Sequence, residues 1–85
     1  MQQKLSLSEI FFKVSAIIID QLGENIKEEI VPSASITRDL GADSLDVAEL
    51  GMKIEKEFDI SLEDKEVEEI NDVESLTNLI AKKLS

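Results

Sequence analysis

The chain has 85 residues, which is enough for one small domain, and we predict a single domain over residues 1–85. Nine basic and 19 acidic residues give a net charge of 9 − 19 = −10. This charge disfavours binding to nucleic acid and anionic membranes and favours basic protein surfaces or cations as partners. The chain contains neither Cys nor His, so it can form no disulfide, no thiolate metal site and no Ser-His-Asp or Cys-His catalytic arrangement.

A first helix is predicted to start after Ser6 and to end at Gly23. Ser6 and Glu9 have the spacing of a capping box, and glycine commonly ends a helix. Phe12 and Ile19 fall roughly opposite the apolar stripe of this helix. The stripe itself is expected to consist of Ile10, Phe11, Val14, Ile17, Ile18 and Leu22.

The same segment matches neither a membrane span nor a convincing export signal. Lys13 interrupts it, and the longest unbroken apolar run is Ala16–Ile19. A spanning helix needs about 20 predominantly apolar residues. We therefore expect a cytoplasmic protein that does not insert into membranes.

A long connection is predicted from Glu24 to Ala42. Loops of this length without structure of their own are uncommon in compact domains, so apolar residues should anchor it to the helices. The segment from Ile26 to Ile30 could form a short turn of helix, which Pro32 would end. The expected anchors are Ile26, Ile30, Val31, Ile36 and Leu40.

The second helix is predicted from Ser44 to Phe58, with Asp43 or Ser44 at its start. Its core face is expected to contain Val47, Leu50, Ile54 and Phe58. Gly51 lies on the same side and would let a neighbouring helix or a ligand chain approach closely. A second apolar line points away from the core and begins beside Ser44. It consists of Leu45, Ala48 and Met52, flanked by Asp46, Glu49 and Glu55.

Two further helices are predicted in the last third of the chain. A capping box of Ser61 and Asp64 would start a short helix that ends near Ile70, with Leu62, Val67 and Ile70 inward. Asn71 or Asp72 would cap a final helix through Leu84, whose stripe is Val73, Leu76, Leu79, Ile80 and Leu84.

No segment shows the sustained two-residue alternation of a strand. The prediction is therefore an all-α, up-down bundle of three main helices plus one short helix, with a long loop between the first and second helices.

The remaining motifs of catalysis and metal binding are missing. Gly41 and Gly51 form no phosphate-binding glycine-rich loop. Acidic residues stand at positions 39, 43, 46 and 49, which is helical spacing and not the spacing of a calcium-binding loop. We expect neither catalytic activity nor a dedicated metal site.

One stretch resembles a known functional signature. Residues 39–46, Asp-Leu-Gly-Ala-Asp-Ser-Leu-Asp, are similar to the attachment site of the acyl carrier proteins. The similarity extends to Ala34–Ile36 before this stretch and to Glu55–Ile60 after it, and it persists more weakly to the last helix. It therefore covers nearly the whole chain. For an isolated Asp-Ser-Leu, the better interpretation would be that Asp43 or Ser44 is simply a helix cap.

The resemblance implies that the Ser44 hydroxyl carries 4′-phosphopantetheine, installed from coenzyme A and Mg²⁺ by a separate phosphopantetheinyl transferase. The thiol that the chain lacks would then arrive on this arm. Thioester-linked acyl intermediates would travel on it between the enzymes of fatty-acid synthesis. An anionic phosphodiester also suits a helix N-terminus.

The resemblance further assigns two surfaces. Basic patches of the partner enzymes would meet Asp43, Leu45, Asp46, Ala48, Glu49, Met52 and Glu55. Acyl chains would retreat into a cavity between the second and third helices, lined by Leu50, Ile54, Leu62, Val67 and Ile70. From the residues alone, these side chains would be interpreted first as ordinary core. A monomer is expected.

Several positions depart from the usual pattern of the family, and Phe11, Phe12 and Ile19 make the first helix more apolar than usual. Arg38 and Lys56 stand where acids are usual, Lys53 adds a base to a typically acidic helix, and Glu63 replaces a usual proline. These departures leave open a specialised polyketide or D-alanyl carrier. In a different class, an unmodified acidic helical interaction module remains the alternative.

Overall fold

A computed structural model describes residues 5–85, so residues 1–4 of the predicted domain lie outside the described part. Over that range the chain forms the helices α1 (Leu7–Leu22), η1 (Glu24–Glu29, a 3₁₀ helix), α2 (Ser44–Phe58), α3 (Asp64–Glu68) and α4 (Val73–Leu84). The only extended pairing in residues 5–85 is an isolated bridge between Ser35 and Asp72. The predicted all-helical bundle with three main helices is confirmed. None of the described helices is long and apolar enough to cross a membrane.

The first helix begins and ends where the sequence predicts. Ser6 Oγ accepts a hydrogen bond from the Glu9 N–H at 3.1 Å, and Glu9 Oε1 accepts one from the Ser6 N–H at 2.8 Å. The helix ends at Gly23, whose positive φ of 98° glycine adopts without strain. The fully buried residues of the stripe are Ile10, Val14 and Ile18. Phe12, predicted to lie opposite, is 79% exposed.

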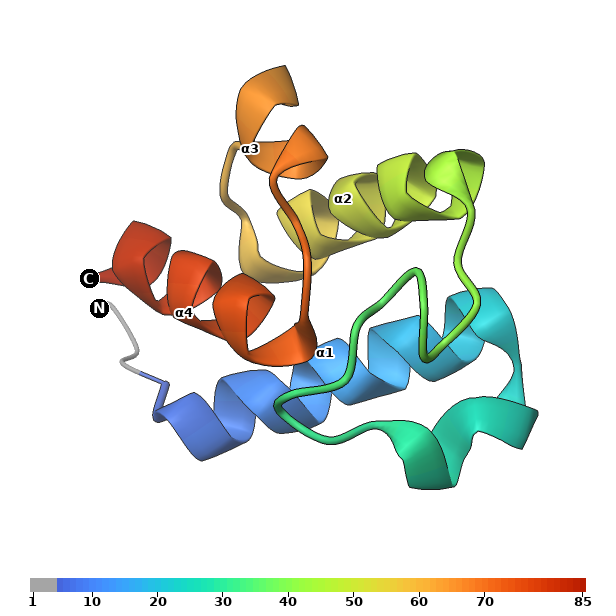
Figure 1. The fold of residues 1–85 in the computed structure, drawn as a ribbon. Coiled ribbons are helices and arrows are strands. Elements are labelled where there is room, and N and C mark those ends of the chain that lie inside the picture. The colour runs from blue at the N-terminus through green and yellow to red at the C-terminus, as the bar shows by residue number, and fades with distance from the viewer. Residues whose placement is uncertain (1–4) are drawn as a thin grey trace.

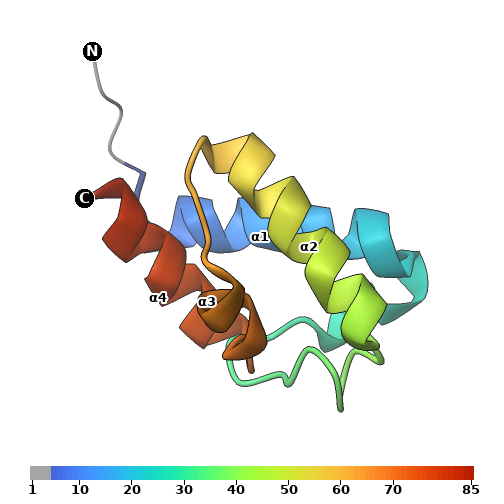
Figure 2. The same ribbon diagram turned by 90° about the horizontal axis from the view of Figure 1, so that it is seen from above.

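Helix α1 is central to the packing of the helices. It packs against α2, α4 and η1, while α3 packs against α2 (Figures 1 and 2). The core between them is made almost entirely of aliphatic side chains. Its largest fully buried members are Ile10, Ile18, Ile36, Leu50, Ile54, Leu76 and Ile80.

The long connection is held against the start of α4 by backbone hydrogen bonds. The Ile36 N–H donates to the Asn71 carbonyl at 2.9 Å, and the Val73 N–H donates to the Ala34 carbonyl at 3.1 Å. Ile36 and Leu40 are buried as predicted. The prediction that Val31 anchors the loop is wrong, because 46% of this residue is exposed. Sequence periodicity could not identify Ala34 and Ala42, which are buried in the loop.

The short third helix differs from its prediction. It spans only Asp64–Glu68, and its N-cap is Glu63, not Ser61. The Glu66 side chain accepts a hydrogen bond from the Glu63 N–H at 2.9 Å, so the reciprocal acid lies two positions later than expected. Helix α4, in contrast, is capped by Asp72, whose carboxylate accepts from the Ser75 N–H at 2.7 Å.

The division of α2 into a core face and an outer face gives a first prediction. Ile54→Ala removes a fully buried side chain from the centre of the core. We expect it to lower the free energy of unfolding by about 2–5 kcal/mol, measured by urea denaturation. Met52→Ala, on the exposed face of the same helix, should change it by less than about 0.5 kcal/mol. Equal losses in the two variants would contradict the assignment of faces.

Candidate functional site

Ser44 is the first residue of α2 and its side chain is exposed. Asp43 is the N-cap: Asp43 Oδ1 accepts from the Asp46 N–H at 2.8 Å, and Asp46 Oδ2 accepts from the Asp43 N–H at 3.2 Å. This reciprocal capping box satisfies two polar groups at the helix start without using the serine. Asp43, and not Ser44, therefore performs the ordinary capping role, which leaves the Ser44 hydroxyl available.

The residues before Ser44 serve to position it. Asp39 Oδ2 accepts a hydrogen bond from the Ser35 N–H at 2.7 Å, and the Ala42 N–H donates to the Ile36 carbonyl at 3.0 Å. Gly41 has a φ of +80° and turns the chain into the helix. Any other L-residue would be strained at this φ, although space for a Cβ is free.

The surroundings of Ser44 suit a phosphodiester. The Ser44 and Leu45 N–H groups lie in the first turn of α2, and neither donates a hydrogen bond to a group in residues 5–85. Free N–H groups and the helix dipole favour an anion at this position. No side chain of the described residues is hydrogen-bonded to the Ser44 hydroxyl, and the neighbouring Asp43 and Asp46 carboxylates accept from backbone N–H groups instead.

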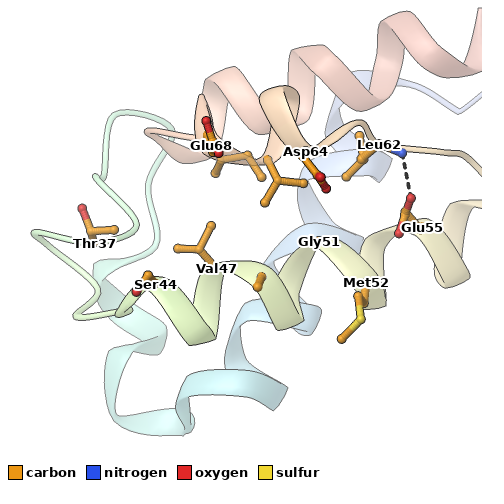
Figure 3. A pocket seen from close by; sticks show the side chains of 12 residues that line it. Thr37, Ser44, Val47, Gly51, Met52, Glu55, Leu62, Asp64 and Glu68 are labelled. Carbon is orange, nitrogen blue, oxygen red and sulfur yellow. Dashed lines mark hydrogen bonds between the residues drawn. The ribbon is translucent and has the colours of Figure 1, made fainter.

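A groove of about 690 Å³ begins beside Ser44 and runs between α2 and α3. In Figure 3, Thr37 and Ser44 stand at one end, while Leu62, Glu55 and Met52 stand at the other. Val47, Gly51, Leu62, Val67 and Ile70 provide most of its apolar wall. Its remaining lining residues are Ala48, Asp64 and Glu68.

Two contacts define the width of this groove. A Cβ at Gly51 would lie 3.4 Å from Val67 Cγ2, so the glycine lets α3 approach α2 closely. Glu55 Oε2 accepts a hydrogen bond from the Leu62 N–H at 2.7 Å and holds the loop before α3 (Figure 3). Glu55, assigned from the sequence to the partner surface, thus also has an internal hydrogen-bond partner.

The structure brings together only part of the predicted cavity. Leu62, Val67 and Ile70 line the groove. Leu50 and Ile54 do not line it, because their side chains are buried in the core against the other helices. Sequence reasoning missed Thr37, Asp64 and Glu68. No periodic signal marks Thr37, since the loop that carries it has no regular repeat.

The predicted partner residues lie along one side of α2. Leu45 and Met52 are 66% and 62% exposed, and both belong to the apolar line beside Ser44. Asp46 and Glu49 are half-buried because Gln21 of α1 contacts them both. The hydrogen bonds from the Gln21 amide and from the Asp43 N–H lower the pKa of Asp46 below its usual value, so it is a carboxylate at neutral pH.

Comparisons with known proteins agree with this geometry. A family described as "Phosphopantetheine attachment site" matches residues 13–80. The chain is 42% identical to an acyl carrier protein of Petrotoga mobilis over 81 residues, which are 95% of this chain and 94% of the relative. Its fold matches the crystal structure of an acyl carrier protein from Thermotoga maritima with a TM-score of 0.79 and 31% identity, over 92% of this chain and 89% of that one. The chain therefore belongs to the acyl carrier protein family, whose members carry acyl groups on a phosphopantetheine arm.

Proposed function

We propose that Ser44 is the attachment point of the 4′-phosphopantetheine arm, and that this chain carries acyl thioesters between the enzymes of fatty-acid synthesis. The observation that carries the proposal is an exposed, unbonded hydroxyl at the start of α2, at the mouth of an apolar groove. The arm supplies the thiol on which the acyl group is held, since the chain has no Cys. The proposal includes a cytoplasmic location, because coenzyme A, the donor of the arm, is an intracellular cofactor.

The chain acts as a carrier and not as a catalyst in this proposal. Removal of the proton from Ser44 Oγ is assigned to the phosphopantetheinyl transferase, because no base among residues 5–85 is hydrogen-bonded to that hydroxyl. The contribution of the chain is to hold the serine at a fixed place, to offer two free backbone N–H groups to the phosphate, and to leave access for a second protein.

The groove between α2 and α3 is proposed to shelter the acyl chain. It begins at the attachment point, and its wall is mostly apolar. Withdrawing a methylene group from water contributes about 0.8 kcal/mol, so even partial burial of a medium-length chain would stabilise the acylated protein.

The outer side of α2 is proposed to be the docking surface for the partner enzymes. Asp43, Asp46 and Glu49 place three acidic groups within two turns of Ser44. The exposed side chains of Leu45 and Met52 add apolar area beside them. Such a surface suits brief encounters with many basic partners, because charge steering raises association rates more than final affinity.

A specialised carrier is the second candidate, and Lys56 is the observation that favours it. Lys53 is paired with Asp20, Nζ to Oδ2 at 2.8 Å, so its charge is compensated within the chain. Lys56 is exposed and forms no ion pair within residues 5–85. The acidic surface thus ends in the unpaired positive charge of Lys56. Only those partners that tolerate a positive charge at this place could bind, which would narrow the set of partners.

The attachment site can be tested directly. The chain is incubated with coenzyme A, Mg²⁺ and a broad-specificity phosphopantetheinyl transferase, and its intact mass is measured. We expect one phosphopantetheinyl group on the unchanged chain and none on Ser44→Ala. Ser61→Ala, another exposed serine near the groove, is the matched control and should be loaded normally. Loading of Ser44→Ala would place the arm elsewhere.

The docking surface predicts a salt-dependent effect of charge reversal. Glu49→Lys should slow loading by the transferase, and the difference from the unchanged chain should be largest at low ionic strength, where screening is weakest. Glu74→Lys, an exposed reversal on α4, is the control and should load at nearly the normal rate. Identical rates for the two variants at every salt concentration would refute the assignment of this surface.

The groove predicts a difference in thermal stability. Loading an octanoyl group on the arm should raise the melting temperature relative to the same protein with the free arm. Val47→Glu puts a carboxylate into the apolar wall and should abolish most of this gain. Each variant is compared with its own unacylated form, so the loss of core packing cancels. Glu68→Gln at the rim is the control, and an unchanged gain in Val47→Glu would exclude the groove as the chain site.

A further inference from the structure

The last turn of α1 reaches the side of α2 that carries the proposed docking surface. Gln21 is half-buried there, and its Nε2 atom donates hydrogen bonds to Asp46 Oδ1 at 3.1 Å and to Glu49 Oε1 at 2.6 Å. Asp46 and Glu49 are three residues apart and therefore share one face of the helix. A single amide thus bridges two like-charged side chains.

The chemistry of this contact fixes the orientation of the amide. Ionised carboxylates only accept hydrogen bonds, so the amino group of Gln21, and not its carbonyl oxygen, must face them. The amino group has two hydrogen atoms, one for each carboxylate. Asp46 is already tied to the helix start through its bond from the Asp43 N–H at 3.2 Å. The hydrogen-bond network therefore runs from α1 through Asp46 to the residue before Ser44.

The amide of Gln21 donates hydrogen bonds but carries no charge. Gln21 restricts the rotamers of both acids while leaving their negative charges in place. The neighbouring residue Asp20 does the opposite, since its carboxylate cancels the charge of Lys53 at 2.8 Å. The end of α1 thus keeps negative charge near Ser44 and removes positive charge one turn further along α2.

We propose that Gln21 is a positioning residue for partner docking: its amide holds Asp46 and Glu49 in fixed directions, with their charge intact, for basic side chains of the enzymes that use this carrier. The inference rests on the proposed function and extends the docking surface to α1. A partner then meets two acids whose conformational freedom is already restricted. Such preorganisation favours binding, because less entropy is lost when the complex forms.

The test uses Gln21→Met, which keeps the length and packing of the side chain and removes both donors. With the transferase and saturating coenzyme A, we expect the KM for the carrier to rise about threefold to tenfold, the change that corresponds to ordering one long side chain on binding. The kcat and the melting temperature should stay near those of the unchanged chain. Asn78→Met, an exposed amide on α4, is the matched control.

A double-mutant cycle separates positioning from a general structural role. In the background Asp46→Asn with Glu49→Gln, the change Gln21→Met should have little further effect on KM, because the acids that it positions are gone. The same rise in KM in both backgrounds would overturn the inference, as would no rise in the otherwise unchanged chain. A joint fall in kcat and melting temperature would indicate only a structural role and would also overturn it.

A second measurement does not depend on loading. Three-bond couplings from NMR report the rotamers of Asp46 and Glu49 in the free carrier. We expect single rotamers of both acids in the unchanged chain. In Gln21→Met, Glu49 should show averaged values, whereas Asp46 should change less because the Asp43 N–H still holds it. Averaged values in both proteins would refute the inference, whereas a complete lack of loading at Ser44 would refute the proposed function and leave this readout intact.

Discussion

The reciprocal capping of α2 by Asp43 and Asp46 is the interaction on which the site depends. It begins the helix at a defined residue, so Ser44 is always the first residue of the first turn. It also satisfies two N–H groups at the helix start, those of Asp43 and Asp46, with carboxylates, so Ser44 is not needed as the cap. Were Ser44 the cap, its hydroxyl would be turned toward backbone N–H groups. Because Asp43 and not Ser44 is the cap, the serine hydroxyl stays free.

The rest of the fold keeps that start in place while the surface stays strongly acidic. The connection before α2 is tied to the beginning of α4 through the Ile36 and Val73 N–H groups, and Asp39 holds its turn. The buried core of α1, α2 and α4 is almost entirely aliphatic and contains no charged side chain. The acidic side chains lie on the outside, so under the proposed function their negative potential is available to attract basic partners.

The sequence allowed a good prediction wherever a local rule was strong. The capping box at Ser6 and the span of α2 follow from short-range hydrogen bonding and a clear apolar period. For α4 the sequence allowed Asn71 or Asp72 as the cap, and the structure has Asp72. The cap at Glu63 was missed because Ser61 and Asp64 also fit the capping pattern and only tertiary packing distinguishes them. The groove was only partly predicted. Leu50 and Ile54 lie on the apolar face of α2 but point away from the groove. Their direction relative to α3 depends on the crossing angle of the helices, and the pattern of one helix does not determine that angle.

Helix α3, which forms one wall of the groove, has few contacts with the rest of the fold. It has five residues, none fully buried, and its contacts are an apolar one with α2 and an ion pair between Glu66 and Lys83 of α4 at 2.8 Å. Elements with few buried contacts open at a lower free-energy cost than the core. Under the proposed function, this wall of the groove can therefore move to fit acyl chains of different length while the three long helices keep their arrangement.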